Sequence, residues 1–319
     1  MKGKIIGTGS YVPKKIVDNN DLAKIVDTND EWIRERTGVI RRHIIEDETT
    51  VSMAASAASR ALESSNTSAE EIDLIIVSTI SPNVFLPCVA CEVQKIIGAV
   101  NATCFDLNAA CTGFVFGYNT ALAYLESGMY KKALVIGSEG LSKLTDWTDR
   151  GTCILFGDGA GAVVVEACEG NAYMGITHSD GNKSDALTCK SKYFTIEGDD
   201  ENGLMKMDGR EVFNFAVRKV PEVIKETLDR NNLAIDEIDY FVLHQANKRI
   251  VDSVAKRLGQ GIDKFPMNMM EYGNTSSASI PILLDEINQK GMLKQGMKIV
   301  IAGFGAGLSW GATVIEWMV

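Results

Sequence analysis

The eight residues Glu70-Glu71-Ile72-Asp73-Leu74-Ile75-Ile76-Val77 have a counterpart 166 positions later, Asp236-Glu237-Ile238-Asp239-Tyr240-Phe241-Val242-Leu243. Each stretch ends in a run of Val, Ile, Leu or aromatic residues, which is typical of a buried strand. Matches at one fixed spacing indicate an internal repeat, and a repeat changes how the whole fold is predicted. The pair therefore predicts a duplicated chain.

Three further matches keep the spacing of 166 residues. They align residues 62–66 with 228–232, 108–111 with 274–277, and 133–137 with 299–303. The last pair of predicted strands, 162–166 and 312–316, is only 150 residues apart, so the first half carries about sixteen extra residues near 143–153. Several matches in one register indicate a duplication.

Within each half, apolar runs of strand length alternate with segments of helical periodicity. Residues 73–79 and 132–137 are predicted to be buried strands, and residues 52–65 and 209–231 to be helices. This alternation predicts parallel strands joined by crossover helices, hence an α/β fold. Two packed halves would place helix layers around and between two sheets. We predict the halves as residues 1–170 and 171–319.

Composition excludes several classes of protein. The chain has 319 residues, a net charge of −10, 45% hydrophobic residues and 23% charged residues, which is ordinary for a folded domain. The acidic excess argues against partners such as nucleic acid or anionic membranes. No segment approaches the ~20 apolar residues that span a membrane, and no signal peptide is recognisable. Seven scattered cysteines predict a reducing, cytoplasmic location and no disulfide framework.

Cys111 is the candidate nucleophile. It follows the predicted strand 102–107 and opens a predicted helix over 112–126. A helix N-terminus favours the thiolate, which is the reactive form of cysteine, and the neighbouring alanines and glycine leave room for a substrate. The alternative is a buried structural cysteine. No metal site is predicted, because the one close cysteine pair, Cys88 and Cys91, has no second pair or histidine nearby.

Two other residues are predicted to approach Cys111. His244 stands at the end of the predicted strand 240–243, at the sheet edge where open α/β folds place their sites. Asn274 belongs to the repeat's counterpart of the turn that carries Cys111. A pseudo-twofold relation between the halves would therefore bring the three residues into one crevice. Taken singly, a structural histidine and an N-capping asparagine are common alternatives.

Two glycine-rich stretches, Gly157–Gly161 and Gly303–Gly307, superficially resemble nucleotide-binding loops. A dinucleotide fingerprint must follow a strand and open a helix, whereas each of these stretches precedes a predicted strand. We therefore reject nucleotide binding. A turn with exposed backbone N–H groups would suit an oxyanion hole instead.

The segments around these residues resemble one enzyme family, β-ketoacyl-acyl-carrier-protein synthase III. The similar segments are Asp106–Phe114, His244–Asn247, Tyr272–Ser276, Gly303–Gly311 and, near the N-terminus, Asp27–Gly38. The resemblance covers essentially the whole chain. It implies a thiolase-like fold, with two duplicated halves in a five-layer α-β-α-β-α arrangement, and a homodimer.

The resemblance also implies a condensation in two stages. Cys111 would accept the acyl group of an acyl-CoA, with the backbone N–H groups of Cys111 and Ala306 as the oxyanion hole. Malonyl-acyl-carrier protein would then enter, and His244 and Asn274 would donate hydrogen bonds to its thioester oxygen as carbon dioxide leaves. The product would be 3-oxoacyl-acyl-carrier protein, at the initiation of type II fatty-acid synthesis. Acyl-CoA and malonyl-acyl-carrier protein are substrates, and no cofactor is implied.

Three groups of binding residues follow from the same resemblance. The residues expected to bind CoA are Thr28, Trp32, Arg36, Arg150, Met207 and Phe213. Those expected to dock the acidic carrier protein are Lys248, Arg249, Lys256 and Arg257, with Arg249 foremost. Phe85 and Leu86 are expected to reach the acyl pocket of a partner subunit, and Leu86 replaces a frequent phenylalanine, so the pocket is expected to differ in size. The alternatives are core packing for Met207 and Phe213 and a solvated surface for the basic helix.

Related enzymes differ at identifiable positions. Thiolases carry a second cysteine in the C-terminal glycine-rich motif, which has none here, and elongating synthases have a histidine where this chain has Asn274. Hydroxymethylglutaryl-CoA synthases need a glutamate base, for which no convincing counterpart is found. The remaining alternatives are a condensing enzyme of secondary metabolism, an inactive thiolase-fold subunit and an acyl-CoA hydrolase. Intact Cys111 and His244 argue against the inactive subunit, and the lack of an evident water-activating acid argues against the hydrolase.

Overall fold

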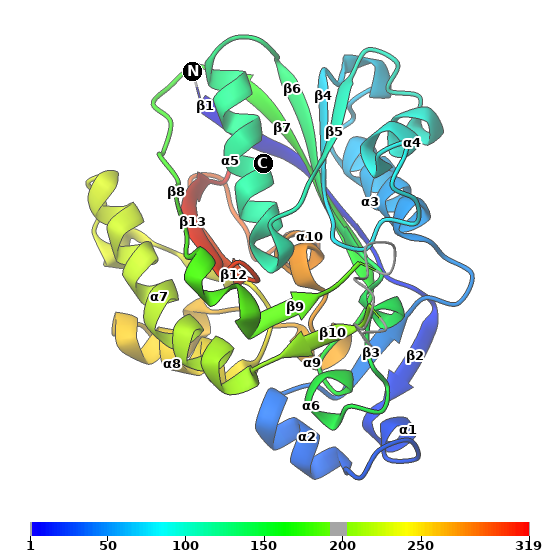
Figure 1. The fold of residues 1–319 in the computed structure, drawn as a ribbon. Helices are drawn as coiled ribbons and strands as arrows, with labels where there is room; N and C mark the ends of the chain where they lie inside the picture. Colours follow the sequence, from blue (N-terminus) through cyan, green and yellow to red (C-terminus); the bar gives the residue numbers. More distant parts are fainter. Residues whose placement is uncertain (1, 192–202, 319) are drawn as a thin grey trace.

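Two β-sheets form the framework of the fold (Figure 1). The computed structural model describes residues 2–191 and 203–318. The first sheet has the strand order β1 (Lys2–Tyr11), β7 (Gly159–Cys168), β6 (Lys132–Glu139), β4 (Leu74–Ser78) and β5 (Thr103–Leu107). The second sheet has the order β8 (Ile176–Ser179), β13 (Ser309–Glu316), β12 (Lys298–Gly305) and β11 (Tyr240–Leu243). Two further strand pairs are β2 (Lys15–Asp18) with β3 (Arg41–Ile44) and β9 (Leu187–Cys189) with β10 (Met205–Met207).

Both sheets are mixed, which corrects the prediction of parallel strands. β4 pairs in parallel with β5 and β6, and β11 pairs in parallel with β12, as crossover helices require. However, β7 runs antiparallel to β6, and β13 runs antiparallel to β12. The reason is clearest in the second half, where only residues 306–308 separate β12 from β13. A parallel connection needs a crossover of about a dozen residues or more.

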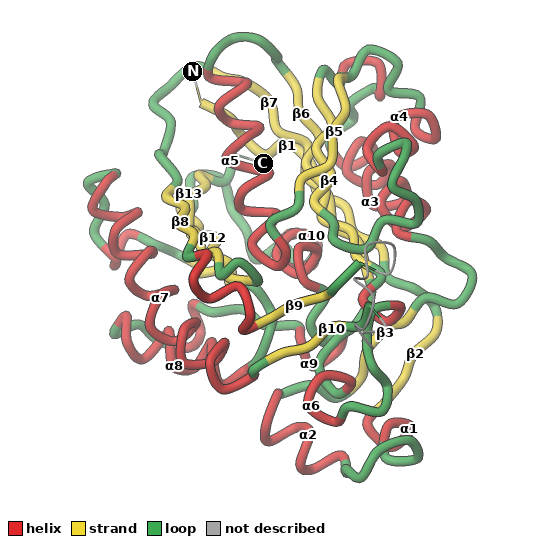
Figure 2. The backbone as a smooth tube through the Cα atoms, in the orientation of Figure 1, coloured by secondary structure: helices red, strands yellow, loops and turns green. Residues whose placement is uncertain are grey.

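Helices cover both faces of each sheet, so the molecule has five layers (Figures 1 and 2). In order, the layers are α3 (Thr50–Ser64) with α4 (Val89–Ile97), the first sheet, α5 (Gly113–Glu126) with α10 (Ser279–Gln289), the second sheet, and α7 (Gly209–Arg230) with α8 (Lys248–Leu258). A buried apolar cluster fills each of the spaces on either side of the two sheets, with the central cluster joining α5 and α10 to both. The shorter helices are α1 (Asn19–Leu22), α2 (Asp30–Thr37), α6 (Arg150–Cys153) and α9 (Met269–Tyr272). The predicted α-β-α-β-α arrangement is confirmed.

The central strand β4 shows why the strand sequences are continuously apolar. Leu74 and Ile76 belong to the cluster between the sheets, whereas Ile75 and Val77 belong to the cluster under α3 and α4. All four side chains are completely buried. Because both faces of the sheet are covered, neither set of alternating residues can be polar.

The duplication extends to backbone detail. β4 and β11 begin 166 residues apart, and so do β6 and β12. Among the described residues, the non-glycine residues with positive φ form two pairs at the same spacing, Asn66 with Asn232 and Ala110 with Ser276. Such backbone is costly for a residue with a Cβ, so its repetition reflects turns that both halves share. The predicted repeat is confirmed, and the boundary at residue 170 stays a prediction.

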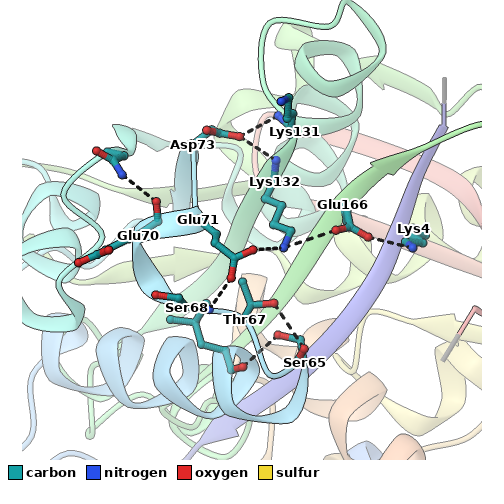
Figure 3. Close-up of polar contacts among 12 residues, drawn as sticks. Lys4, Ser65, Thr67, Ser68, Glu70, Glu71, Asp73, Lys131, Lys132 and Glu166 are labelled. Atoms are coloured by element: carbon teal, nitrogen blue, oxygen red, sulfur yellow. Dashed lines mark hydrogen bonds and ion pairs between the residues drawn. The ribbon is translucent and has the colours of Figure 1, made fainter.

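A charged network at one end of the first sheet explains the repeated acidic segment (Figure 3). Lys132 pairs with Glu71 and, at 3.4 Å, with Glu166, which also pairs with Lys4 at 2.8 Å. Asp73 accepts a hydrogen bond from the backbone N–H of Lys132 at 3.0 Å. The second half repeats these contacts in Lys298 with Glu237 at 2.7 Å, and in the N–H of Lys298 with Asp239 at 2.8 Å. The acidic residues thus hold the starts of neighbouring strands together in both halves.

Two equivalent glycines allow a matched stability test. A Cβ on Gly137 would overlap the backbone oxygen of Ser277, whereas a Cβ on Gly303 would lie 3.4 Å from its nearest neighbour, the Cα of Thr112. We expect Gly137→Ala to lower the free energy of unfolding by about 1–3 kcal/mol, because the opposing backbone must move. Gly303→Ala should change it by less than about 1 kcal/mol, since ordinary contacts accept a methyl group. Urea unfolding followed by circular dichroism measures the free energy of unfolding of both variants. Equal decreases in the two variants would contradict the close contact between Gly137 and the backbone of Ser277.

Candidate active site

Cys111 lies in a 3-10 turn, Ala110–Thr112, between β5 and α5. Ala110 has a φ of +47°, so the chain bends sharply before the helix begins. The cysteine is buried, with 8% of its surface exposed. It nevertheless lines two cavities, of about 460 Å³ and about 210 Å³. The predicted strand–turn–helix setting of Cys111 is confirmed.

The larger cavity brings the three candidate catalytic residues together. Cys111, His244 and Asn274 all line it, although they come from β5–α5, the end of β11 and the turn before α10. Gly305 at the end of β12 packs against the cysteine, because a Cβ there would lie 2.7 Å from the backbone nitrogen of Cys111. The convergence that the pseudo-twofold relation predicts is therefore present.

The environment of His244 makes it a neutral hydrogen-bond donor. Its Nδ1 lies 2.7 Å from the hydroxyl oxygen of Ser279, which also accepts the backbone N–H of Gln245 at 3.3 Å. The oxygen of Ser279 can accept this N–H and still direct its own proton to Nδ1, and in that arrangement the ring proton of His244 is on Nε2. Burial lowers the pKa of His244 to about 3, so the ring is uncharged at neutral pH.

Asn274 is oriented in a comparable way. Its side-chain oxygen accepts the backbone N–H of Ser276 at 2.8 Å, so its NH₂ group remains for a ligand in the cavity. Its backbone N–H donates to Leu155 at 2.8 Å, and its backbone oxygen accepts from Gly157 at 3.0 Å. The amide donor of Asn274 is thus held in place from three directions.

The pKa of the Cys111 thiol depends on burial as well as on neighbouring polar groups. Burial raises the pKa of the thiol to about 12, and the negative charge of Glu139 acts in the same direction, while the hydroxyl of Ser276 lowers the pKa. The resting side chain is therefore a thiol. Burial thus opposes the thiolate that a helix N-terminus favours, and the predicted effect of the helix N-terminus stays a prediction.

Glu139, the last residue of β6, was missed by the sequence analysis. It is completely buried and accepts hydrogen bonds from Thr79, Ile80, Ser81, Ser276 and Ser277. Burial raises its pKa to about 7. The only signal in the sequence was a charged residue at the end of a predicted buried strand, where a carboxylate needs partners. Glu139 lines neither of the two cavities, so the expectation that no water-activating acid lies beside the candidate residues stays a prediction.

Comparison with known proteins identifies the family. Residues 105–181 match the family model described as 3-oxoacyl-[acyl-carrier-protein (ACP)] synthase III, and residues 228–317 match the model of its C-terminal part. A β-ketoacyl-[acyl-carrier-protein] synthase III of Clostridium acetobutylicum is 54% identical over 98% of each chain. The chain belongs to the 3-oxoacyl-[acyl-carrier-protein] synthase III family.

Solved structures agree in fold. The 3-oxoacyl-[acyl-carrier-protein] synthase III of Aquifex aeolicus has a TM-score of 0.94 and 42% identity, covering 99% of this chain and 100% of its own. A priming β-ketosynthase of a polyketide biosynthetic pathway has a TM-score of 0.95 and 35% identity, over 99% and 96% of the two chains. The thiolase-like fold that the family resemblance implies is therefore confirmed.

The residues predicted to bind CoA lie mainly at the larger cavity. Those that line it are Trp32, Arg36, Met207 and Phe213. The guanidinium group of Arg150 lies over Trp32, 4.9 Å from the ring centre. The adenine ring of CoA would need a separation of about 7 Å between the Trp32 ring and the Arg150 guanidinium group, because it would make a contact of about 3.5 Å with each. One of the two side chains must therefore move to admit the ring. Thr28 does not line the cavity, but its buried hydroxyl has no hydrogen-bond partner among the described residues.

The predicted docking residues for the carrier protein are all exposed. They are Lys248, Arg249, Lys256 and Arg257 on α8. Arg249 also lines the larger cavity, with its guanidinium group 5.2 Å from the ring centre of Phe213. Lys248 pairs with Asp252 at 2.7 Å, which partly balances its charge. Of the four, Arg249 is therefore the residue that shares a cavity with Cys111.

The apolar wall of the smaller cavity consists of residues of this chain that the sequence analysis did not name. Phe85 and Leu86 line neither cavity and are 66% and 87% exposed. Instead, the apolar wall beside Cys111 consists of Ile80, Leu141, Phe156, Leu187 and Met205. An exposed loop is what the predicted reach into a partner subunit requires, and Phe85 and Leu86 have no role in the pocket of their own chain. Their contribution to a second copy stays a prediction.

Ala306 lies where the oxyanion-hole prediction requires it. It lines the smaller cavity together with Cys111 and follows Gly305, which packs on the cysteine. The position of Ala306 is compatible with a backbone donor near the reacting sulfur. The hydrogen bonds themselves stay a prediction.

Proposed function

We propose that this chain condenses an acyl-CoA primer with malonyl-acyl-carrier protein, the initiation step of type II fatty-acid synthesis. The products are 3-oxoacyl-acyl-carrier protein, CoA and carbon dioxide. The observation that carries the proposal is the cavity shared by Cys111, the Nε2–H of His244 and the side-chain NH₂ of Asn274. The names of relatives at 54% and 50% identity agree with this activity.

In the first stage, the sulfur of Cys111 attacks the thioester carbon of the acyl-CoA. The bond to the CoA sulfur breaks, and the acyl group remains on Cys111. We assign the negative oxygen of the intermediate to the backbone N–H groups of Cys111 and Ala306, and one such donor is typically worth about 2.7–4 kcal/mol. The smaller cavity, about 210 Å³ in volume, would hold the acyl chain, and the larger would hold the CoA arm.

In the second stage, the malonyl thioester occupies the larger cavity. When its bond to the carboxylate breaks, the electron pair moves toward the thioester oxygen, which becomes negative. His244 and Asn274 stabilise this oxygen through fixed donors in a site with little water. The resulting carbanion attacks the acyl carbon, the bond from that carbon to the sulfur of Cys111 breaks, and the sulfur takes up a proton from solvent to return to the thiol. Because the leaving carboxylate supplies the electron pair, we propose that no metal or redox cofactor takes part.

The partners follow from the surface. Arg249 offers a positive charge at the cavity to an acidic carrier protein, although the chain has a net charge of −10. We propose the homodimer that the family resemblance implies, because large apolar side chains are exposed before, on and after α4: Val84, Phe85, Leu86, Ile96 and Val100. Cytoplasmic location stays a prediction. In the part of the chain that the structure describes, no helix has the length and apolar character needed to cross a membrane.

Two alternatives share this site. The likeness to a polyketide priming synthase favours secondary metabolism as a second candidate, which would use the same residues with another carrier protein. Hydrolysis of acyl-CoA would need an acid that activates water, and the buried acid near the site, Glu139, lines neither cavity. Substrates and products, rather than the fold, separate these alternatives.

A product assay tests the proposed function. The chain should release carbon dioxide and form a 3-oxoacyl product from malonyl-acyl-carrier protein and at least one member of an acyl-CoA series. Labelled malonyl groups and mass spectrometry measure the two products, and Cys111→Ala, which cannot be acylated, is the control that forms no 3-oxoacyl product. CoA release without condensation would indicate a hydrolase. Condensation only with a polyketide carrier protein would indicate secondary metabolism.

Substitution of the donors should separate the two stages. We expect His244→Ala and Asn274→Ala to allow acylation of Cys111 but to slow condensation by at least about 100-fold, as loss of an oxyanion donor does. Ser279→Ala should slow condensation about fivefold, because one positioning hydrogen bond of about 1 kcal/mol is lost, and Ser279→Thr should restore it. Rapid-quench mass spectrometry measures both stages. Loss of acylation in His244→Ala would contradict a donor role limited to condensation.

Charge reversal tests the docking surface. We expect Arg249→Glu to raise the KM for malonyl-acyl-carrier protein about tenfold, with acylation by acyl-CoA largely unchanged. The wild-type reaction with the carrier protein should weaken as salt rises. Arg230→Glu, at the exposed end of α7, is the matched control and should behave as wild type. Equal losses in both half-reactions would mean that Arg249 serves the CoA path instead.

A further inference from the structure

The proposed first stage leaves one proton without an acceptor. Cys111 rests as a thiol, so its proton must leave as the sulfur attacks. His244 must carry its proton on Nε2 to act as the donor of the proposed second stage, and its Nδ1 is occupied by Ser279. It therefore has no free lone pair facing the cavity. Another group must accept the thiol proton.

Glu139 is a buried carboxylate on the far side of Ser276. Its Oε1 accepts the hydroxyl groups of Ser276 at 3.2 Å and Ser277 at 3.0 Å. Its Oε2 accepts hydrogen bonds from Ser81 at 2.7 Å and from the backbone N–H of Ile80 at 3.1 Å. Within residues 2–191 and 203–318, it has no ion-pair partner. Neutral donors stabilise this carboxylate, so it can gain a proton without breaking an ion pair.

Ser276 connects the carboxylate to the nucleophile. Ser276 and Cys111 line the same cavity of about 210 Å³, and the two turns that carry them pack against each other. The position of Ser276 is fixed by its backbone N–H, which donates to Asn274 at 2.8 Å, and by its left-handed backbone, with a φ of +51°. Since its hydroxyl proton points to Glu139, its oxygen lone pairs are available to the thiol proton.

We propose that Glu139 accepts the proton of Cys111 through the hydroxyl of Ser276. As the sulfur attacks the thioester, the thiol proton moves to the oxygen of Ser276, and the hydroxyl proton of Ser276 moves to Glu139. The carbon–sulfur bond to CoA then breaks, and the CoA sulfur receives a proton back along the same path. Cys111 ends as a thioester, CoA as a thiol and Glu139 as a carboxylate. This step rests on the proposed function and adds a base that acts during acylation.

The surroundings of Glu139 suit this role. The groups that face it are hydroxyls and one backbone amide, from the loop after β4 and from the turn before α10. Among the titratable groups of the described residues, the thiol of Cys111 interacts electrostatically with Glu139, whose negative charge raises the pKa of the thiol. Burial raises the pKa of Glu139 to about 7, so the carboxylate form, which can act as the base, increases between about pH 6 and pH 8.

Three variants test the relay. We expect Glu139→Gln and Ser276→Ala to slow single-turnover acylation of Cys111 by at least about tenfold, toward the ~100-fold that a general base contributes. Ser277→Ala, which removes a hydrogen bond to the same carboxylate oxygen at a residue that does not line the smaller cavity, should slow acylation clearly less than Ser276→Ala. The wild-type rate should rise between about pH 6 and pH 8, and this rise should be absent in Glu139→Gln. Equal slowing in Ser276→Ala and Ser277→Ala would overturn the relay in favour of a structural role.

Alkylation of Cys111 by iodoacetamide gives a second measurement that needs no condensation or acyl-CoA. If Glu139 acts as the base, Glu139→Gln should slow alkylation at pH 8. If its charge only opposes the thiolate, Glu139→Gln should accelerate alkylation, because the pKa of Cys111 would fall, and this result would overturn the proposal. If no acyl-CoA acylates the wild type, the proposed function fails while alkylation still tests the relay. Thermal unfolding identifies a misfolded variant, and Ser276→Ala then provides the test.

Discussion

The turns that open α5 and α10 pack against the opposite half of the molecule so closely that backbone meets backbone. The backbone oxygen of Ser277 lies against Gly137, and its hydroxyl donates to the backbone oxygen of Ser78 at 3.0 Å. On the other side, Gly305 lies against the backbone of Cys111. Glycine is required where a Cβ would occupy the position of another backbone. This contact between the halves places the nucleophile of one half beside the hydrogen-bond donors of the other.

The charge states of the site follow from the same packing, because it removes water. Burial raises the pKa of Cys111 to about 12 and that of Glu139 to about 7, and it lowers the pKa of His244 to about 3. Each shift favours the neutral form. Neutral donors in a dry site are suited to an oxygen that becomes negative only during the reaction, because no permanent charge competes with it and the local dielectric is low. In the proposed relay, the proton of Cys111 moves along one such buried group, the hydroxyl of Ser276.

The two halves share the same backbone fold, and several residues of the proposed active site stand at positions where the two halves differ in sequence. Glu139 and Gly305 occupy equivalent positions, at the ends of β6 and β12. The glycine admits the backbone of Cys111, whereas the glutamate binds the serines of the other half. Cys111 is itself the counterpart of Ser277, at a spacing of 166 residues. The longer connection between β6 and β7 in the first half also carries Arg150, which lies over Trp32.

The sequence by itself determined the elements, the repeat and the meeting of Cys111, His244 and Asn274. Strand 240–243 and the start of the helix at Gly209 were predicted where the structure has them, since periodicity and capping are local properties of a chain. Only the tertiary structure decided that Cys111 is a thiol, because its protonation depends on burial by many residues, whereas the helix dipole is local. It also revealed Glu139, whose partners Ser276 and Ser277 lie 137 and 138 residues away. No local pattern encodes which distant hydroxyls will surround a buried carboxylate.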